Sequence, residues 1–144
     1  MGLVGSLKKM IRKKKKIVRN KDSGTEIEKY VKSVGHAIDG IVYSFICEHN
    51  MIIILIAILT VTGAGLYFEI SNSEWFFCII MFGIITATEL INTSVEAVVD
   101  LITTDYNKLA KIAKDTASAA TFVLALTSVV GAIIIFLPKI LELI

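Results

Sequence analysis

Four side chains that could do chemistry stand three or four positions apart in an otherwise apolar segment. They are Glu89, Asn92, Glu96 and Asp100. At 3.6 residues per turn they share one stripe of a helix, within an arc of roughly 80°. The surrounding segment, 75–102, is dominated by Phe, Ile, Val, Met and Ala. A carboxylate at bilayer depth costs about 2.5–3.5 kcal/mol on insertion scales, so this stripe indicates a functional site.

The composition is typical of a membrane protein. Of 144 residues, 55% are hydrophobic, and the mean hydropathy of +0.74 is high for a soluble domain. The first 32 residues hold eleven Lys and Arg against three Asp and Glu, a net charge of +8, whereas the whole chain has +2. A basic block before long apolar runs is more typical of the cytoplasmic flank of a membrane protein than of a nucleic-acid-binding arm. We therefore expect no nucleic-acid partner.

Three apolar runs are long enough to cross a bilayer, which predicts an all-α membrane protein with three transmembrane helices. The expected spans are about 51–68, 75–99 and 116–137. Lys and Arg number eleven before the first span, none in the first connection, three in the second and one after the third span. Cytoplasmic flanks carry the excess of these residues, so the N-terminus and the second connection are expected in the cytoplasm.

An amphipathic segment precedes the first span. Residues 27–45 place apolar side chains at a helical period, with charged side chains elsewhere around the helix. This pattern predicts an amphipathic helix lying on the cytoplasmic leaflet. The expected organisation is a mobile basic arm, 1–24, attracted to anionic membrane lipids, followed by a single membrane domain, 25–144.

The predicted spans place the charged side chains near them at one depth in the membrane, close to the cytoplasmic interface. Counting ~30 Å of hydrocarbon from Trp75 leaves Glu89 in the inner third of the bilayer and Glu96 near the cytoplasmic interface. Glu48 and Lys114 reach a similar level from the helices before and after. A lipid alcohol presents its hydroxyl at this boundary, and ATP can approach it from the cytoplasm.

This level suits phosphoryl transfer from MgATP to a lipid alcohol. Such a reaction needs a base for the hydroxyl, carboxylates for Mg²⁺ and a cation for the developing charge. Glu89 fits the role of the base, and Lys114 fits that of the cation. Glu48 and Glu96 fit the role of metal ligands. The sequence has neither a GxxxxGK[ST] loop nor a Gly-rich kinase loop, so neither familiar way of holding a nucleotide applies.

Other interpretations of the same residues exist. Asn92 can join helices by hydrogen bonding, Glu48 can be an interfacial anchor, and Asp100 can be a helix-end charge. A different class of function is a small transport or proton-relay protein with Glu89 and Glu96 as carriers. Against it, the carboxylates gather at one interface and the outer half of the second span offers no polar path. A third class is a catalytically inactive assembly factor.

A longer pattern around these residues resembles a known family. The chain contains the runs Glu89-Leu-Ile-Asn92-Thr-Ser-Val-Glu96-Ala-Val-Val-Asp100 and Ala113-Lys114-Asp115-Thr-Ala-Ser118. Together they resemble the signature of the prokaryotic diacylglycerol kinase family, which includes undecaprenol kinases. The resemblance extends over about 30–137. Relatives often carry arginines after the first glutamate, whereas here Glu48 is followed by His49-Asn50-Met51-Ile52.

The resemblance implies an architecture and an activity. The architecture is a homotrimer of three-span protomers in the bacterial inner membrane, each with an N-terminal surface helix. The activity is transfer of the γ-phosphate of ATP, with Mg²⁺ as cofactor, to a lipid alcohol. Undecaprenol is the first expectation for that alcohol and diacylglycerol is the second. The completeness of the motif argues against an inactive assembly factor.

The resemblance also implies roles for single residues. Glu89 would be the general base with Asn92 supporting it, and both belong to the expected catalytic set. Glu48 and Glu96 would hold the metal that ATP carries. Residues expected to meet the nucleotide are His36, Glu48, Glu96, Asp105, Tyr106, Asn107, Lys114 and Asp115. Glu89 and Asp100 are assigned to binding of the lipid substrate.

Overall fold

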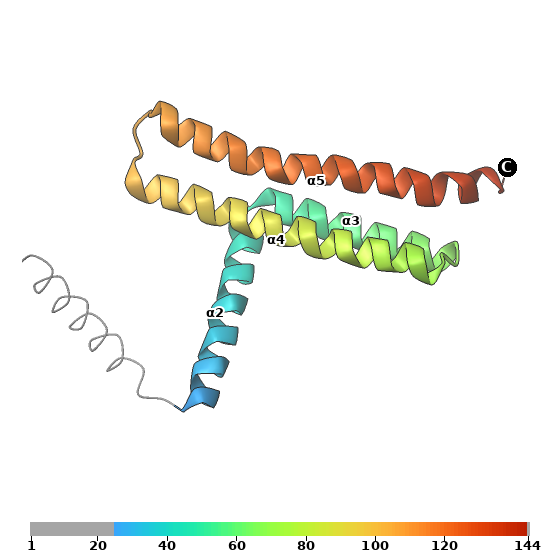
Figure 1. Ribbon diagram of the computed structural model, residues 1–144, viewed down its shortest axis with the longest axis horizontal. Coiled ribbons are helices and arrows are strands. Elements are labelled where there is room, and N and C mark those ends of the chain that lie inside the picture. The colour runs from blue at the N-terminus through green and yellow to red at the C-terminus, as the bar shows by residue number, and fades with distance from the viewer. Residues whose placement is uncertain (1–24, 144) are drawn as a thin grey trace, which may run out of the picture. The chain divides into compact units, whose positions relative to one another are not determined.

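The computed structural model describes residues 25–143, which form four α-helices (Figure 1). The helices are α2 (Glu26–Cys47), α3 (His49–Tyr67), α4 (Asn72–Ile102) and α5 (Lys108–Leu141). Between residues 25 and 143 there is no β-strand, which confirms the predicted all-α class. The basic arm predicted at 1–24 lies outside the described residues.

The chain divides into two compact units, residues 1–39 and 40–144. Of the first unit the structure describes Thr25 and the first part of α2, which includes His36. The second unit contains the end of α2 and all of α3, α4 and α5. All the other predicted site residues lie in this second unit.

Helix α2 begins with a reciprocal cap. The backbone N–H of Thr25 donates to Glu28 Oε2 at 2.9 Å, and the N–H of Glu28 donates to Thr25 Oγ1 at 3.3 Å. Apolar side chains recur along the helix and remain exposed, among them Ile27, Tyr30 and Val34. The bounds agree with the predicted amphipathic segment 27–45 to within two residues at each end.

Helices α3, α4 and α5 are each long and apolar enough to cross a membrane. Their positions confirm the three predicted spans. Helices α4 and α5 are longer than the predicted spans 75–99 and 116–137 and extend beyond them at both ends. Helix α4 begins at a capping box between Ser71 and Glu74. Helix α5 begins at an Asn107 cap, whose side-chain oxygen accepts from the N–H groups of Leu109 and Ala110 at 2.8 and 3.2 Å. These polar caps start helices outside the apolar runs.

The turn between α3 and α4 is tight. Glu69 adopts a left-handed backbone conformation with φ of 49°. The N–H of Ile70 then donates to the carbonyl of Gly65 at 3.1 Å, which closes the end of α3 as a Schellman motif. Left-handed conformations favour glycine, so Glu69 places a side chain where L-residues are mildly strained.

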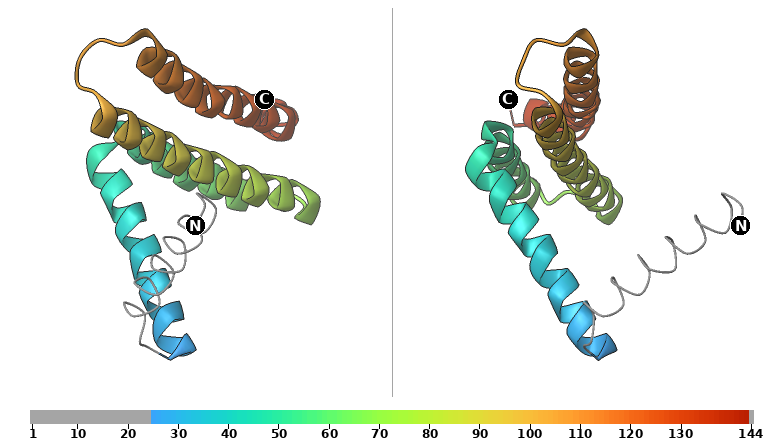
Figure 2. Two further views of the ribbon diagram at one scale, coloured as in Figure 1. Left: turned by 60° about the vertical axis from the view of Figure 1, so that its left-hand side comes forward. Right: turned by 90° about the vertical axis from the view of Figure 1, so that its left-hand side faces the viewer.

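Helix α4 packs against both α3 and α5, and both views in Figure 2 show it beside each of them. Glycines on α3 and α5 allow these helices to approach aromatic side chains of α4 closely, at the end of the unit opposite the carboxylate stripe. A Cβ added to Gly65 would lie 2.8 Å from the ring of Trp75, and one added to Gly131 would overlap the ring of Phe77. At the same end Lys139 of α5 pairs with Glu74 of α4 at 3.8 Å.

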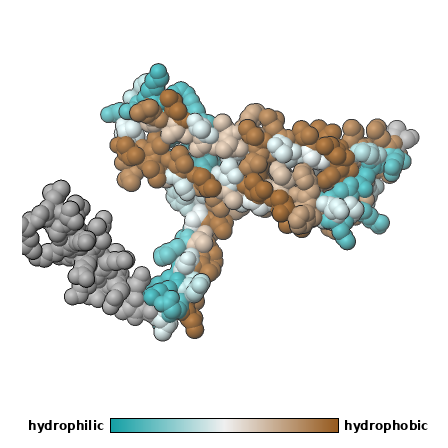
Figure 3. Space-filling view, in the orientation of Figure 1, coloured by the Kyte–Doolittle hydropathy of each residue, from teal (hydrophilic) through white to brown (hydrophobic). Residues whose placement is uncertain are grey.

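Polarity follows the long axis of the three-helix unit. Figure 3 shows apolar side chains along the middle of α3, α4 and α5 and polar side chains at both ends. Several hydroxyls within the helices donate to carbonyls four residues earlier, as those of Thr60, Thr116 and Ser128 do. The Thr121 hydroxyl oxygen is buried without a partner among the described residues. The exposed apolar middle is that of a multi-pass membrane protein.

Candidate active site

Glu89 lies in the middle of α4 and is fully buried, with 0% of its surface exposed. Neither of its carboxylate oxygens has a hydrogen-bond partner among residues 25–143. Thr93, one turn later, donates its hydroxyl to the backbone carbonyl of Glu89 at 3.0 Å. A buried carboxylate without a partner is costly for folding, and such groups cluster at functional sites.

Asn92 and Glu96 are joined by a side-chain hydrogen bond. Asn92 Nδ2 donates to Glu96 Oε1 at 3.1 Å, one turn apart on the same face of α4. Asn92 is 2% exposed, and its Oδ1 has no partner in the described part of the chain. The bond fixes one oxygen of Glu96 and leaves the other free to accept. The described contact of the Asn92 side chain is thus with Glu96, whereas its expected role was to support Glu89.

Glu48 stands at the junction of α2 and α3, where it occupies the N-cap position of α3 without capping it through its side chain. Partial burial raises the pKa of Glu48, and the negative charges of Glu96 and Glu89 raise it further, while His49 lowers it. The Glu48 carboxylate, just before α3, is therefore within electrostatic reach of both Glu89 and Glu96 on α4. Among the described residues, however, no group of three or more His, Cys, Asp or Glu side chains is arranged to hold a metal ion by itself.

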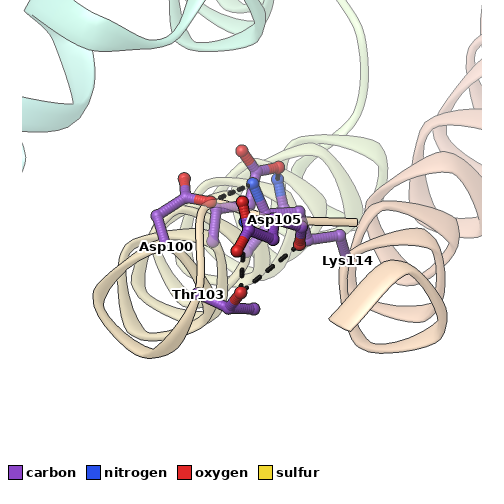
Figure 4. A network of polar contacts seen from close by, with 6 residues as sticks. Asp100, Thr103, Asp105 and Lys114 are labelled. Atoms are coloured by element: carbon purple, nitrogen blue, oxygen red, sulfur yellow. Dashed lines mark hydrogen bonds and ion pairs between the residues drawn. The ribbon is translucent and has the colours of Figure 1, made fainter. Parts of the chain in front are cut away.

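Asp100 and Lys114 form an ion pair that joins the end of α4 to the start of α5 (Figure 4). Lys114 Nζ donates to Asp100 Oδ1 at 2.6 Å. Thr103 orders the connection between α4 and α5, because its hydroxyl accepts from the N–H of Asp105 at 3.1 Å. The structure thus brings together two residues to which the sequence assigned separate roles.

The remaining predicted nucleotide residues divide into two groups. Asp105 and Tyr106 are exposed in the connection between α4 and α5, and Asn107 caps α5 through its side-chain oxygen. Asp115 lies one residue after Lys114 and pairs with Lys111 at 2.6 Å on the exposed face of α5. These residues share the end of the unit that carries Asp100. His36 belongs to the other unit and is not placed relative to them.

Two hollows adjoin the carboxylate stripe. A groove of about 440 Å³ between α4 and α5 is lined by Asn92 and by Thr88 and Thr116, two residues that the sequence did not single out. The available signal for Thr88 was its spacing of four residues before Asn92, which places both side chains on one face of α4. A second cavity of about 280 Å³ lies among α3, α4 and α5, is lined mostly by apolar side chains, and reaches Ile85, one helical turn before Glu89.

Comparison with known proteins identifies the family. Residues 35–136 match the family described as prokaryotic diacylglycerol kinase. The chain is also 38% identical over 120 residues to undecaprenol kinase from Bacillus subtilis (strain 168), an alignment that covers 83% of this chain and 98% of that protein. The family match contains the whole carboxylate stripe and its surroundings, and it confirms the resemblance inferred from the motif. The chain belongs to the prokaryotic diacylglycerol kinase family, and it is a multi-pass membrane lipid kinase.

Proposed function

We propose that this protein transfers the γ-phosphate of MgATP to the hydroxyl of a lipid alcohol, with undecaprenol as the preferred substrate and diacylglycerol as the second. The observation that carries the proposal is the fully buried Glu89 carboxylate, whose oxygens have no partner in the described chain. It lies on the same helix face as Glu96 and within electrostatic reach of Glu48. The relative named undecaprenol kinase supports the choice of alcohol.

Glu89 acts as the general base. The lipid hydroxyl donates to one Glu89 oxygen and loses its proton to it as its own oxygen attacks the γ-phosphorus. The bond between that phosphorus and the β–γ bridging oxygen breaks, and ADP leaves. A base in this position contributes about 10²–10⁴-fold in rate. The support for this role is that Glu89 has both oxygens available, whereas one oxygen of Glu96 already accepts from Asn92.

Glu48 and Glu96 are proposed to hold Mg²⁺ together with the phosphates of ATP. Mg²⁺ is usually bound by one or two carboxylates plus substrate phosphates, so these two carboxylates fit it. The unpaired Oδ1 of Asn92 adds a further oxygen of the kind that hard cations prefer. When bound, the ion would neutralise charge on the β- and γ-phosphates. The hydrogen bond from Asn92 keeps Glu96 in one orientation for this task.

The cationic and polar groups at the α4–α5 connection are proposed to meet the nucleotide. Lys114 would face the phosphates, and Asp115 and the connection 105–107 would contact the remainder of ATP. The exposure of Asp105 and Tyr106 leaves them accessible from the aqueous side. His36 is retained as a nucleotide contact on the resemblance alone.

The hydrocarbon part of the substrate is proposed to lie along the apolar surface of the bundle. The cavity that reaches Ile85 ends one turn from Glu89, and most of its lining side chains are apolar. A long, flexible chain with a terminal hydroxyl suits such a path.

The family also supports a cellular arrangement. We infer a homotrimer in the bacterial inner membrane with the N-terminus in the cytoplasm, in which residues 25–144 form one lipid-kinase domain and residues 1–24 a basic arm beside anionic lipids. The exposed apolar side chains of α3, α4 and α5 provide surface both for lipid and for neighbouring protomers. The excess of Lys and Arg before α3 supports the orientation.

The substrate preference is tested with purified protein in mixed micelles. Undecaprenol and diacylglycerol are supplied separately with MgATP, and kcat/KM is measured for each alcohol. We expect the value for undecaprenol to be higher. A higher value for diacylglycerol would reverse the proposed preference, and no phosphorylation of either alcohol by folded protein would contradict the proposed reaction.

A further inference from the structure

The ion pair between Asp100 and Lys114 joins two helices. A charge that served only to stabilise the end of α4 would not need a partner on α5. The two residues are 14 positions apart, and the pair crosses from α4 to α5 at 2.6 Å. The Lys114 side chain is 36% exposed and that of Asp100 is 59% exposed. Glu96 also lies close enough to interact with the charge of Lys114. Lys114 is therefore held on the side of α4 that carries the carboxylate stripe.

The connection between the helices is fixed without this pair. The N–H of Thr103 donates to the carbonyl of Val99 at 3.0 Å at the end of α4. The Thr103 hydroxyl orders Asp105, and Asn107 caps α5. The backbone turn thus has its own hydrogen bonds. The ion pair therefore adds a fixed orientation of the Lys114 side chain.

A lysine needs such a partner when its position matters. Its ammonium group sits on a flexible four-carbon stem and carries three donors. One donor is used by Asp100 Oδ1, which leaves two for oxygens of a phosphate. Without Asp100 the ammonium would sample several rotamers, among them positions against Glu96 that would compete with a metal ion.

We propose that Asp100 is a positioning residue for phosphoryl transfer, which aims Lys114 at the phosphate and does not itself contact the lipid. The inference rests on the proposed role of Lys114 at the nucleotide. It replaces the assignment of Asp100 to the substrate with an action through another side chain. Because Lys114 would stabilise charge that develops during transfer, its misplacement appears mainly in kcat.

The test is a double-mutant cycle in the full-length membrane protein. Turnover is measured for wild type, Asp100→Asn, Lys114→Gln and the double variant, with MgATP and lipid alcohol varied separately. We expect Asp100→Asn to lower kcat about tenfold, which is less than the ~10²-fold that a misplacement of about 1 Å can cost, and to change both KM values less than about twofold. In the Lys114→Gln background, the same substitution should have no further effect on kcat. Asp100→Glu should recover part of the loss.

A control variant separates positioning from the joining of helices. Lys139→Gln removes another α4–α5 ion pair, with Glu74, at the opposite end of the unit. Thermal unfolding of each variant in detergent shows how much stability each pair supplies. We expect both variants to unfold at similar temperatures, with kcat lowered in Asp100→Asn alone.

Each other outcome overturns the proposal in a different way. Unchanged kcat in Asp100→Asn means that Lys114 finds its position unaided. A lower KM for MgATP with unchanged kcat means that Asp100 competes with the nucleotide, and a higher KM for lipid means that it contacts the substrate. Additive losses in the double variant mean that the two residues act independently. Normal turnover in Lys114→Gln would instead contradict the proposed role of Lys114, whatever Asp100 does.

Discussion

Replacement of Glu89 should separate activity from stability. Glu89→Gln keeps the shape of the side chain and removes the basic oxygen. If Glu89 takes the proton of the lipid hydroxyl, turnover should fall about 10²–10⁴-fold, which corresponds to about 2.7–5.4 kcal/mol in activation free energy. Binding of MgATP should change little, since the buried carboxylate is proposed to face the lipid hydroxyl and the proposed metal ligands remain in place.

The burial of Glu89 predicts that removal of its carboxylate stabilises the folded protein, although the same change lowers turnover. Its side chain is 0% exposed, and both of its oxygens lack a partner in the described residues. A buried polar group without a partner costs about 1–3 kcal/mol. Glu89→Leu, which fills a similar volume without oxygens, should therefore raise the free energy of unfolding by about 1–3 kcal/mol while abolishing turnover.

Two assays on the same preparations check both expectations. Phosphate transfer to lipid is followed in mixed micelles, and thermal unfolding in detergent is followed by circular dichroism. Isothermal titration with MgATP confirms that the Gln variant still binds nucleotide. Near-normal turnover in folded Glu89→Gln would refute the role of base. A strongly destabilised Glu89→Leu would refute the claim that the carboxylate has no stabilising partner in the folded protein.

Three further predictions concern the metal ligands, the arm and a packing contact. Glu48→Ala and Glu96→Ala should each weaken MgATP binding, with partial rescue by raised Mg²⁺; unchanged affinity in both would contradict the metal role. Deletion of Met1–Asn20 should leave lipid phosphorylation per molecule similar, because that segment precedes the matched family region; a folded truncation that binds lipid without transferring phosphate would place the arm in the site. Gly131→Ala should destabilise the protein by about 1–3 kcal/mol, since its Cβ meets a phenylalanine ring, whereas Gly63→Ala, with nothing within 4 Å, should be neutral or stabilising.

The sequence predicted the spans well because hydrophobic length is a direct requirement of the bilayer. It placed the start of the third span at 116, whereas α5 begins at Lys108. Apolar content marks the hydrocarbon boundary, but Asn107 starts the helix eight residues earlier through a side-chain cap. Similarly, α5 continues past Pro138 to Leu141. A proline lacks only its own N–H donor, so the N–H groups of the residues after it can still donate, as that of Glu142 does to the Pro138 carbonyl at 3.1 Å.

The candidate site was predictable where it lies on one helix. A rotation of 100° per residue places Glu89, Asn92 and Glu96 on one face of α4, and the Asn92–Glu96 hydrogen bond agrees with that placement. The pair between Asp100 and Lys114 was not predictable, because it depends on how α4 and α5 cross and on the turn between them. The partner of a side chain across a helix interface is set by tertiary packing, which periodicity does not encode.

The fate of the γ-phosphate tests the central claim most directly. Membranes containing the protein are incubated in parallel with ATP labelled at the γ- or the α-phosphate, and the extracted lipids are separated and counted. We predict label in a lipid phosphate from γ-labelled ATP alone, at a level that added undecaprenol increases and that falls at least ~10²-fold with Glu89→Gln. Lipid label that is equal for the two positions, or γ-label that persists unchanged in the folded Gln variant, would contradict phosphoryl transfer at this site.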